Sequence, residues 1–507
     1  MKKKTSPKPE KFPRQRFFKR LISAPVQAEA IINLDDVIGE IDPRIYGHSL
    51  TYQERCLYGG LYSDDGTQVN EDVLKLIKAL KPPIIRIPDN PNYDQSDHAH
   101  KPNQIGIDEL LTFCHQVGAE PYLVINDSPN ANVEIGRLLA DSKALLKKIQ
   151  GITHESEDFL SANSVKLWGL SRDNQDGEPE LPENALAYAN ELQQLISAMR
   201  SIDPAIDIVA TGSALLESDP YNGETWNRTI LKALGDQINY FSFQLFHPGE
   251  TGFQEYYDPE KLYHSIVAAP HSAEDVINRM AAQIQEIAPD FKIALALDAY
   301  NVKLPPPPTS TSPQDLTYRL RDGLYVAGML NVFHRQCNSL KIANITHLVN
   351  ALPMITKPNH GAAFPTPLYF PFKLYQMMEK QVLEVGLWSP FFKSEPLGQT
   401  ISRKDEVPYI DITATRSGDA SRLGLSILNL HPHKSAKVTL NLKSESSNSQ
   451  YRIHQAWEMS GPDPLAANTA DVPDRVNIRQ IKAPKLKFGW LDAVLPPASL
   501  VVLTLEY

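Results

Sequence analysis

The order of apolar runs along the chain constrains its fold more than any other feature. From about residue 31 to 390, short apolar runs alternate with longer stretches whose apolar residues recur at helical spacing. The expected strands lie at residues 82–88, 120–126, 165–171, 207–213, 240–246 and 292–298. Strand followed by helix, many times over, indicates a parallel sheet covered by helices. The pattern favours an α/β fold, a (β/α)8 TIM barrel, with a doubly wound open sheet as the alternative.

The pattern changes after about residue 395. Short alternating strands separated by turn residues follow one another, as in "PYIDITATRSG" (408–418) and "SLVVLTLEY" (499–507). These segments predict a C-terminal antiparallel β-sandwich over residues 391–507. The barrel is then expected over residues 31–390. Pairing of its first strand with the sandwich is the alternative for that strand. The proline-rich stretch 303–315 is expected to be a stiff exposed loop of the barrel.

Composition limits the classes of protein to consider. The chain has 507 residues, 42% of them apolar, which is enough for more than one domain. Since no apolar run approaches the roughly 18 residues of a membrane span, we expect a cytoplasmic protein. Cys56, Cys114 and Cys337 are widely spaced and odd in number, which fits a reducing compartment. Metal-binding motifs are missing from the sequence, so we expect no metal and no cofactor.

The N-terminus has the opposite charge from the rest of the chain. Residues 1–20 carry nine Lys or Arg and one Glu, a net charge of +8. Since the whole chain has a net charge of −10, the remaining residues have a net charge of −18. We expect residues 1–30 to be a disordered basic tail. The alternative is that residues 2–20 dock to an anionic membrane surface or to a larger protein assembly. The acidic body gives no reason to expect nucleic acid as a partner, and we find no secretory signal.

Polar segments follow the expected strands. Reacting groups of a barrel of this kind lie on the loops after the strands. Those loops read "RIPDNPNYDQ" (86–95), "VINDSPN" (124–130), "GLSRDNQDGEPE" (169–180), "QLFHPGE" (244–250) and "LDAYNVKLPPPP" (297–308). By themselves they predict only a pocket of unknown use.

Several spaced segments resemble one enzyme family. They include "DPRIYGHSL" (42–50), "IIRIP" (84–88), "VKLWGL" (165–170), "NITHLVNALPMIT" (344–356) and "TPLYFPFKLY" (366–375), in the family's order. From about residue 31 onward the chain resembles the α-L-arabinofuranosidases of glycoside hydrolase family 51. That resemblance implies a (β/α)8 barrel followed by a β-sandwich, carbohydrate as ligand, and a homo-oligomer.

The resemblance also implies where the catalytic carboxylates should be. The family hydrolyses with retention, which needs a nucleophile and an acid/base about 5–5.5 Å apart. In the segment that matches the family's acid/base motif, Trp168 and Gly169 agree but Asp173 stands where glutamate is expected. In the nucleophile motif, Asp298 agrees but Ala299 stands in place of glutamate.

Other positions depart from the family as well. Thr51 and Tyr52 replace a Glu-His pair, Asp89 and Asn90 replace two glycines, and Gln244 stands where a histidine is usual. Added side chains at 89 and 90 would keep a sugar away from the backbone there.

Neither Asp298 nor Asp173 is well suited to take over the role of a catalytic glutamate. Adjacent strand residues face opposite sides, so we expect Asp298 to point away from the face of residue 299 unless a bulge intervenes. Asp173 is one methylene shorter than glutamate, and Arg172 beside it would favour its ionised form. Loss of a covalent nucleophile can lower the rate by about 10⁶-fold.

We therefore interpret the chain as a catalytically degenerate arabinofuranosidase-like protein, either a carbohydrate-binding or a structural subunit. The alternatives are an active glycosidase with a non-standard site, or other chemistry by Asp89, Asp94, Asp127, Asp173 or Asp176, all of which are also common turn residues. His247 and His347 are expected to be structural. If the chain binds carbohydrate, we expect aromatic residues to hold the sugar, with packing in the core as their alternative role: Tyr52, Tyr93, Trp168 and Tyr300. The candidate ligand-pocket residues are Thr51, Tyr52, Asp89, Asn90, Asn126, Trp168, Arg172, Gln244, Asp298 and Tyr300.

Overall fold

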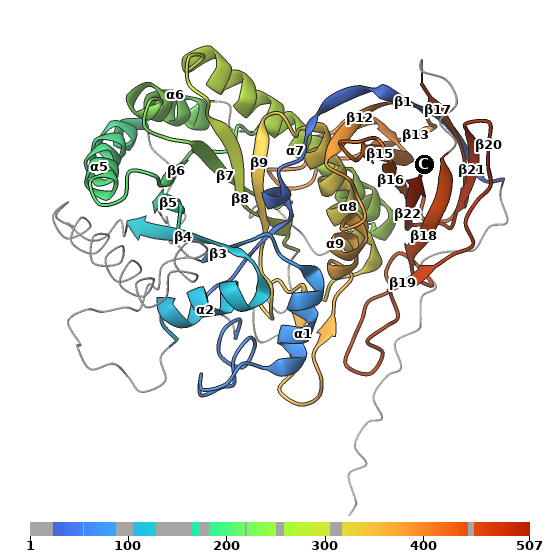
Figure 1. The fold of residues 1–507 in the computed structure, drawn as a ribbon, viewed down its shortest axis with the longest axis horizontal. Helices are drawn as coiled ribbons and strands as arrows, with labels where there is room; N and C mark the ends of the chain where they lie inside the picture. The colour runs from blue at the N-terminus through green and yellow to red at the C-terminus, as the bar shows by residue number, and fades with distance from the viewer. Residues whose placement is uncertain are drawn as a thin grey trace, which may run out of the picture.

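The protein consists of a closed parallel barrel beside a large curled β-sheet (Figure 1). The computed structural model describes residues 24–53, 55–87, 105–127, 165–172, 182–218, 221–249, 258–304, 317–444 and 451–507. Residues 1–23 of the expected tail, most of the proline-rich loop and the segments 88–104 and 173–181 lie outside the described residues.

The barrel has eight strands that pair in sequence order and close between the first and the last. They are β2 (Gly47–Ser49), β3 (Ile84–Ile87), β4 (Glu120–Asp127), β5 (Leu167–Arg172), β6 (Asp207–Thr211), β7 (Tyr240–His247), β8 (Ala294–Val302) and β9 (Leu340–Ile345). All neighbouring pairs are parallel. The predicted TIM barrel is confirmed, and the open sheet is excluded.

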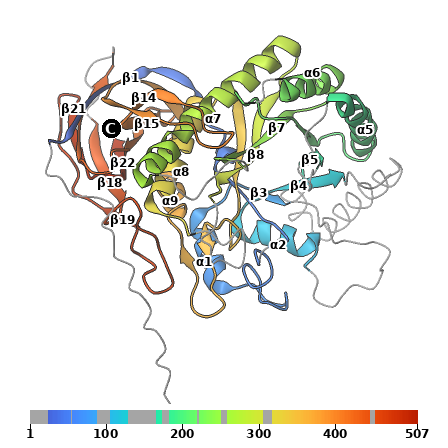
Figure 2. The same cartoon turned by 180° about the vertical axis from the view of Figure 1, so that it is seen from behind.

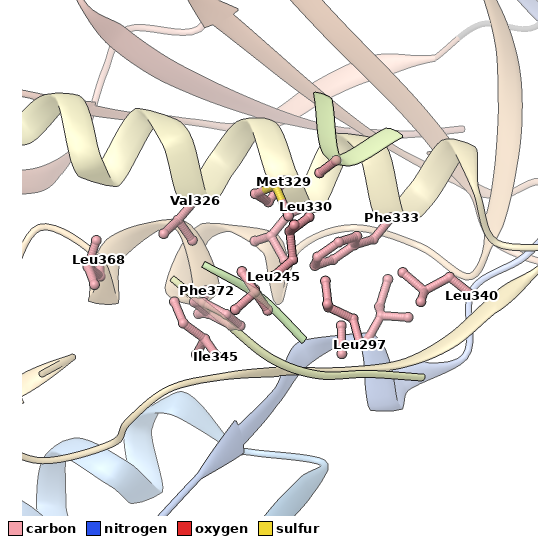
Figure 3. Packing of buried hydrophobic residues seen from close by; sticks show 14 of the residues in the cluster. Leu245, Leu297, Val326, Met329, Leu330, Phe333, Leu340, Ile345, Leu368 and Phe372 are labelled. Atoms are coloured by element: carbon pink, nitrogen blue, oxygen red, sulfur yellow. The ribbon is translucent and has the colours of Figure 1, made fainter. Parts of the chain in front are cut away.

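Helices cover the outside of the barrel. They are α1 (Glu71–Leu80), α2 (Ile107–Val117), α5 (Pro182–Arg200), α6 (Asn222–Leu234), α7 (Pro259–Ile287), α8 (Leu320–Arg335) and the short α9 (Tyr369–Tyr375). Figure 3 shows the contact of α8 with the barrel, where Leu330 and Phe333 pack toward Leu245 and Leu297. A short 3-10 helix η1 (Pro43–Tyr46) precedes β2 at the N-terminal end of the barrel.

The C-terminal domain is one ten-stranded sheet, ordered β19-β18-β22-β16-β15-β12-β1-β17-β21-β20. Its strands are β1 (Val26–Glu40), β12 (Gln381–Trp388), β15 (Ile410–Arg416), β16 (Arg422–Asn429), β17 (Ala436–Lys443), β18 (Arg452–Ser460), β19 (Asn477–Gln480), β20 (Leu486–Lys487), β21 (Trp490–Leu495) and β22 (Ser499–Glu506). Except for the parallel pair of β1 with β17, neighbours are antiparallel. Inward residues from both halves of the sheet share one core, so the sheet folds over itself as a β-sandwich (Figure 2).

The observed domain limits differ from the expected ones at both ends. β1 lies between β12 and β17, so the first strand pairs with the sandwich, as the sequence allowed. It begins at Val26, so residues 26–30 belong to this strand and not to the tail. β12 also lies in the sandwich, ten residues earlier than the expected limit of 391. The sequences of β1 and β12 both show the alternation typical of strands. Which sheet each strand joins depends on partner strands that are far away in the sequence. Two small hairpins complete the fold: β10 (Ile355–Thr356) with β11 (Phe364–Pro365), and β13 (Phe391–Ser394) with β14 (Lys404–Pro408).

Candidate active site

The inside of the barrel changes from apolar to polar toward the C-terminal ends of the strands. Alternate strand residues face inward, and a small apolar layer fills the lower part. Its members are Ile84, Tyr122, Val124, Leu167, Val209, Ala296 and Ile342. Above them lie Arg86, Ser242 and Asp298, all buried. These polar groups form the floor of the barrel mouth.

Asp298 is held by three neighbours. Its Oδ1 accepts a hydrogen bond from the Tyr122 hydroxyl at 2.8 Å, and Ser242 also hydrogen-bonds to it. Its Oδ2 lies 3.9 Å from Nε of Arg86. The side chain is only 3% exposed. Burial raises the pKa of Asp298 above its ordinary value, and this effect outweighs the opposing influence of its partners.

The Tyr122 ring reaches across the barrel because strand β5 leaves room for it. A side-chain carbon at Gly169 would lie 2.8 Å from the Tyr122 hydroxyl and 3.0 Å from Val124 Cγ2. Only glycine leaves that space, so the close approach explains this residue on purely structural grounds.

A bulge at Asp298 corrects our expectation for the two neighbours on β8. Phe243 pairs with Leu297, but Gln244 pairs with Ala299, so β8 holds one more residue than β7 at this point. Ala299 therefore shares the face of Gln244 at the mouth, while Asp298 also reaches inward to Tyr122. Asp298 and Ala299 therefore both point to the inner face of the barrel, although they are adjacent in the chain. Residue 299 is buried at 4% exposure, and Gln244 is exposed.

Two predicted pocket aromatics lie elsewhere. Trp168 is fully buried in the layer between the barrel and its helices, and its Nε1 donates to the carbonyl of Val165. Tyr300 packs edge-on against Phe333 of α8, with ring centroids 5.2 Å apart. Both positions face outward from the barrel, so neither ring lines the mouth.

Other predicted positions are placed only in part. Thr51 is buried and accepts a hydrogen bond from the Gln53 backbone, while Tyr52 packs against the main core. For Asn126, Asp127 and Arg172 the structure describes the strand backbone but not the side chain. The predicted residues Asp89, Asn90, Tyr93, Asp94, Asp173 and Asp176 lie outside the described residues.

The two histidines are buried, as expected of structural histidines. His347 Nδ1 lies 3.0 Å from the Ser49 hydroxyl, and burial lowers its pKa to about 3, with a further contribution from Arg86. His247 Nδ1 lies 2.9 Å from the Thr400 hydroxyl, and burial lowers its pKa to about 3 as well. Both rings are neutral at pH 7.

The floor residues Arg86, Tyr122 and Ser242 were not among our predicted site residues. The sequence could have indicated them, because each is a polar residue within an otherwise apolar strand, at a position that faces the inside of the barrel. Within the described ranges, no group of three or more His, Cys, Asp or Glu could hold a metal ion. None of the helices there combines the length and apolarity needed to span a membrane.

Comparisons with known proteins agree with this architecture. Residues 298–499 match the model of the α-L-arabinofuranosidase C-terminal domain. An intracellular exo-α-(1→5)-L-arabinofuranosidase of Acetivibrio thermocellus is 25% identical over 450 residues, 80% of this chain and 86% of that protein. A probable α-L-arabinofuranosidase C of Aspergillus niger is 25% identical over 459 residues, 80% of this chain and 85% of that protein.

Solved structures are similar over nearly the whole chain. The family 51 α-L-arabinofuranosidase of Thermotoga petrophila superimposes with a TM-score of 0.77 at 23% identity, covering 94% of this chain and all of that one. The family 51 enzyme of Bifidobacterium longum gives 0.76 at 21% identity, covering 96% of this chain and all of that one. In sequence and in fold, this chain resembles the α-L-arabinofuranosidases of glycoside hydrolase family 51.

Proposed function

We propose that this chain is a catalytically degenerate arabinofuranosidase-like protein that serves as a carbohydrate-binding or assembly subunit. One observation carries the proposal: at the end of β8, a buried Asp298 that accepts a hydrogen bond from Tyr122 is followed by Ala299 at the mouth. A retaining hydrolase needs a carboxylate free to attack the sugar. The Asp298 carboxyl instead binds within the barrel wall, and Ala299 offers only a methyl group.

Two other acidic residues with described side chains lie on the barrel strands, and both are far from the mouth. Glu120 and Asp207 stand at the first residues of β4 and β6, at the opposite end of the barrel from the strand tips. There the Arg44 guanidinium, paired with Asp42, donates to the Tyr240 hydroxyl. These charges close the bottom of the barrel and cannot replace a nucleophile at residue 299.

The alternative is an active glycosidase that releases α-L-arabinofuranosyl residues with a non-standard site. The names of the relatives favour it, since the Acetivibrio and Aspergillus proteins are called arabinofuranosidases. In that case Asp173 would act as the acid and another loop residue as the nucleophile.

Partners and location belong to the same proposal. The basic residues 2–20 would tether the acidic body to a larger assembly or an anionic membrane surface, and the body would form a homo-oligomer. A cytoplasmic location is supported by three buried free cysteines and by the word "intracellular" in the names of several relatives.

Restoring both carboxylates tests the proposal. Ala299→Glu combined with Asp173→Glu should raise hydrolysis of 4-nitrophenyl α-L-arabinofuranoside above that of the unaltered chain, because it returns the two groups that retention requires. Ala299→Gln with Asp173→Asn adds similar side chains without carboxylates and should gain nothing. Glycosidase-level hydrolysis by the unaltered chain would contradict a non-catalytic role.

A further inference from the structure

The floor of the mouth holds a positive charge that the described residues neutralise incompletely. Arg86 is 8% exposed, and Nε lies 3.9 Å from the nearest Asp298 oxygen, at the outer limit of an ion pair. Among described residues this Nε has no hydrogen-bond partner. Tyr122 also hydrogen-bonds to the guanidinium, and its ring centroid lies 6.0 Å from Arg86 Cζ. A buried Nε–H without an acceptor is unfavourable, so this position suits an additional anion.

Asp298 is a weak counter-charge for Arg86. One of its oxygens accepts from Tyr122, the other lies 3.9 Å from Arg86 Nε, and burial raises the pKa of its carboxyl. The charge of Arg86 also contributes to the lowered pKa of His347 on the opposite side. The positive potential of Arg86 therefore extends to both neighbours.

Adjacent strands add unused hydrogen-bonding groups. Thr346 Oγ1 and both polar atoms of the Asn344 amide are buried without a partner among the described residues. Asn344 lies on β9, in register with Gly47 of β2, and Ser49 of β2 is in register with Arg86. Asn344 lies beside Ile84 in the apolar layer below the floor, whereas Thr346 lies two residues further along the chain, toward the mouth. Buried polar atoms are nearly always hydrogen-bonded, so the Thr346 hydroxyl suits a ligand at the floor.

Residue 299 decides the chemistry of that ligand. It faces the mouth directly after Asp298, and its methyl group brings no charge. We infer that the barrel mouth binds a sugar acid, a uronate or aldonate whose own carboxylate is directed toward Arg86. This inference rests on the proposed carbohydrate-binding role and names the chemical class of the ligand.

Titration calorimetry on the full chain tests the carboxylate preference with a matched pair. D-Galacturonate and D-galactose differ only at C6, so the acid should bind at least about 10-fold more tightly at constant ionic strength. Acetate measures the charge alone and should bind more weakly than galacturonate. Equal binding of acid and neutral sugar, or acetate as tight as galacturonate, would overturn the inference.

Added negative charge at the mouth should abolish that preference. Gln244→Glu is nearly isosteric and lies beside Ala299, and Ala299→Glu adds a carboxylate on the same face. Each should weaken galacturonate binding about 10-fold through like-charge repulsion, while Ala299→Gln should retain it. If Ala299→Gln also loses binding, the added volume at residue 299 is the cause, and Gln244→Glu becomes the deciding variant. Unchanged affinity of Gln244→Glu for galacturonate would overturn the inference.

The two proposals fail in different ways. Hydrolysis of an aryl arabinofuranoside by the unaltered chain refutes the non-catalytic role whatever the titrations give. A missing preference for galacturonate refutes only the assignment of the ligand.

Discussion

Asp298 matches a catalytic motif of the resembling family, yet its contacts are those of a structural residue. Its carboxyl lies on the inner wall of the barrel, satisfies the Tyr122 hydroxyl and faces Arg86. A nucleophile must instead reach the sugar. The bulge at β8 brings residue 299 to the mouth, and this residue is an alanine.

Substitution of Asp298 should therefore affect stability more than any activity. Asp298→Ala leaves the Tyr122 hydroxyl and Arg86 without this partner and should lower the free energy of unfolding by about 2–4 kcal/mol. Asp298→Asn keeps an acceptor for Tyr122 and should lose less. Denaturation followed by fluorescence measures both, and an equal loss in the two variants would contradict the importance of that acceptor.

At the scale of elements, the barrel and the sandwich are joined by a charged cluster on α8. Arg335 donates to Glu274 of α7 at 3.0 Å and to Asp411 of β15 at 2.9 Å. Asn331, one turn earlier, also donates to Asp411. These partners raise the pKa of Arg335 despite its burial. The cluster holds two helices of the barrel to the sheet.

Arg335→Ala should lower the free energy of unfolding by about 2–4 kcal/mol, since it leaves two partly buried carboxylates without their cation. Arg228 is the matched control, because it also bridges two carboxylates but on the exposed surface. Arg228→Ala should cost less than about 1 kcal/mol. Equal losses in the two variants would show that the α8 cluster has no special role.

Element patterns predicted most of the fold but only part of the site. Six barrel strands were predicted from apolar runs, whereas β2 has only three residues and β9 is interrupted by Lys341 and Asn344. The outward positions of Trp168 and Tyr300 depend on strand parity and on the bulge, which composition does not reveal. The membership of β1 in the sandwich depends on partners about 350 to 410 residues away along the chain.

Across the whole molecule, buried neutral histidines should set the acid limit of stability. Among the described residues, burial lowers the pKa of four histidines to about 3: His48, His247, His334 and His347. Unfolded chains bind these protons near pH 6.5, so between pH 6.5 and 3 the unfolded state holds more protons than the folded state. Stability is then greatest above pH 6.5 and falls with acidification, by up to about 1.4 kcal/mol per pH unit for each site.

The raised pKa values of Asp298 and Glu120 act in the opposite direction, but these are two groups against four. We expect the thermal midpoint to fall from pH 7 to pH 5. His247→Gln should reduce that fall, and the same change at exposed His454 should not. A midpoint that is constant over this range would contradict the buried neutral state of these rings.

Our central proposal is that this glycosidase-like barrel carries no hydrolytic chemistry at its mouth. Its most direct test is the kcat/KM of the unaltered chain for 4-nitrophenyl α-L-arabinofuranoside, measured with the inactive Ala299→Gln variant as background. Enzymes commonly reach 10⁴–10⁸ M⁻¹s⁻¹, and the missing nucleophile predicts a value indistinguishable from that background. A value above about 10² M⁻¹s⁻¹, within 100-fold of ordinary enzymes, would contradict the account.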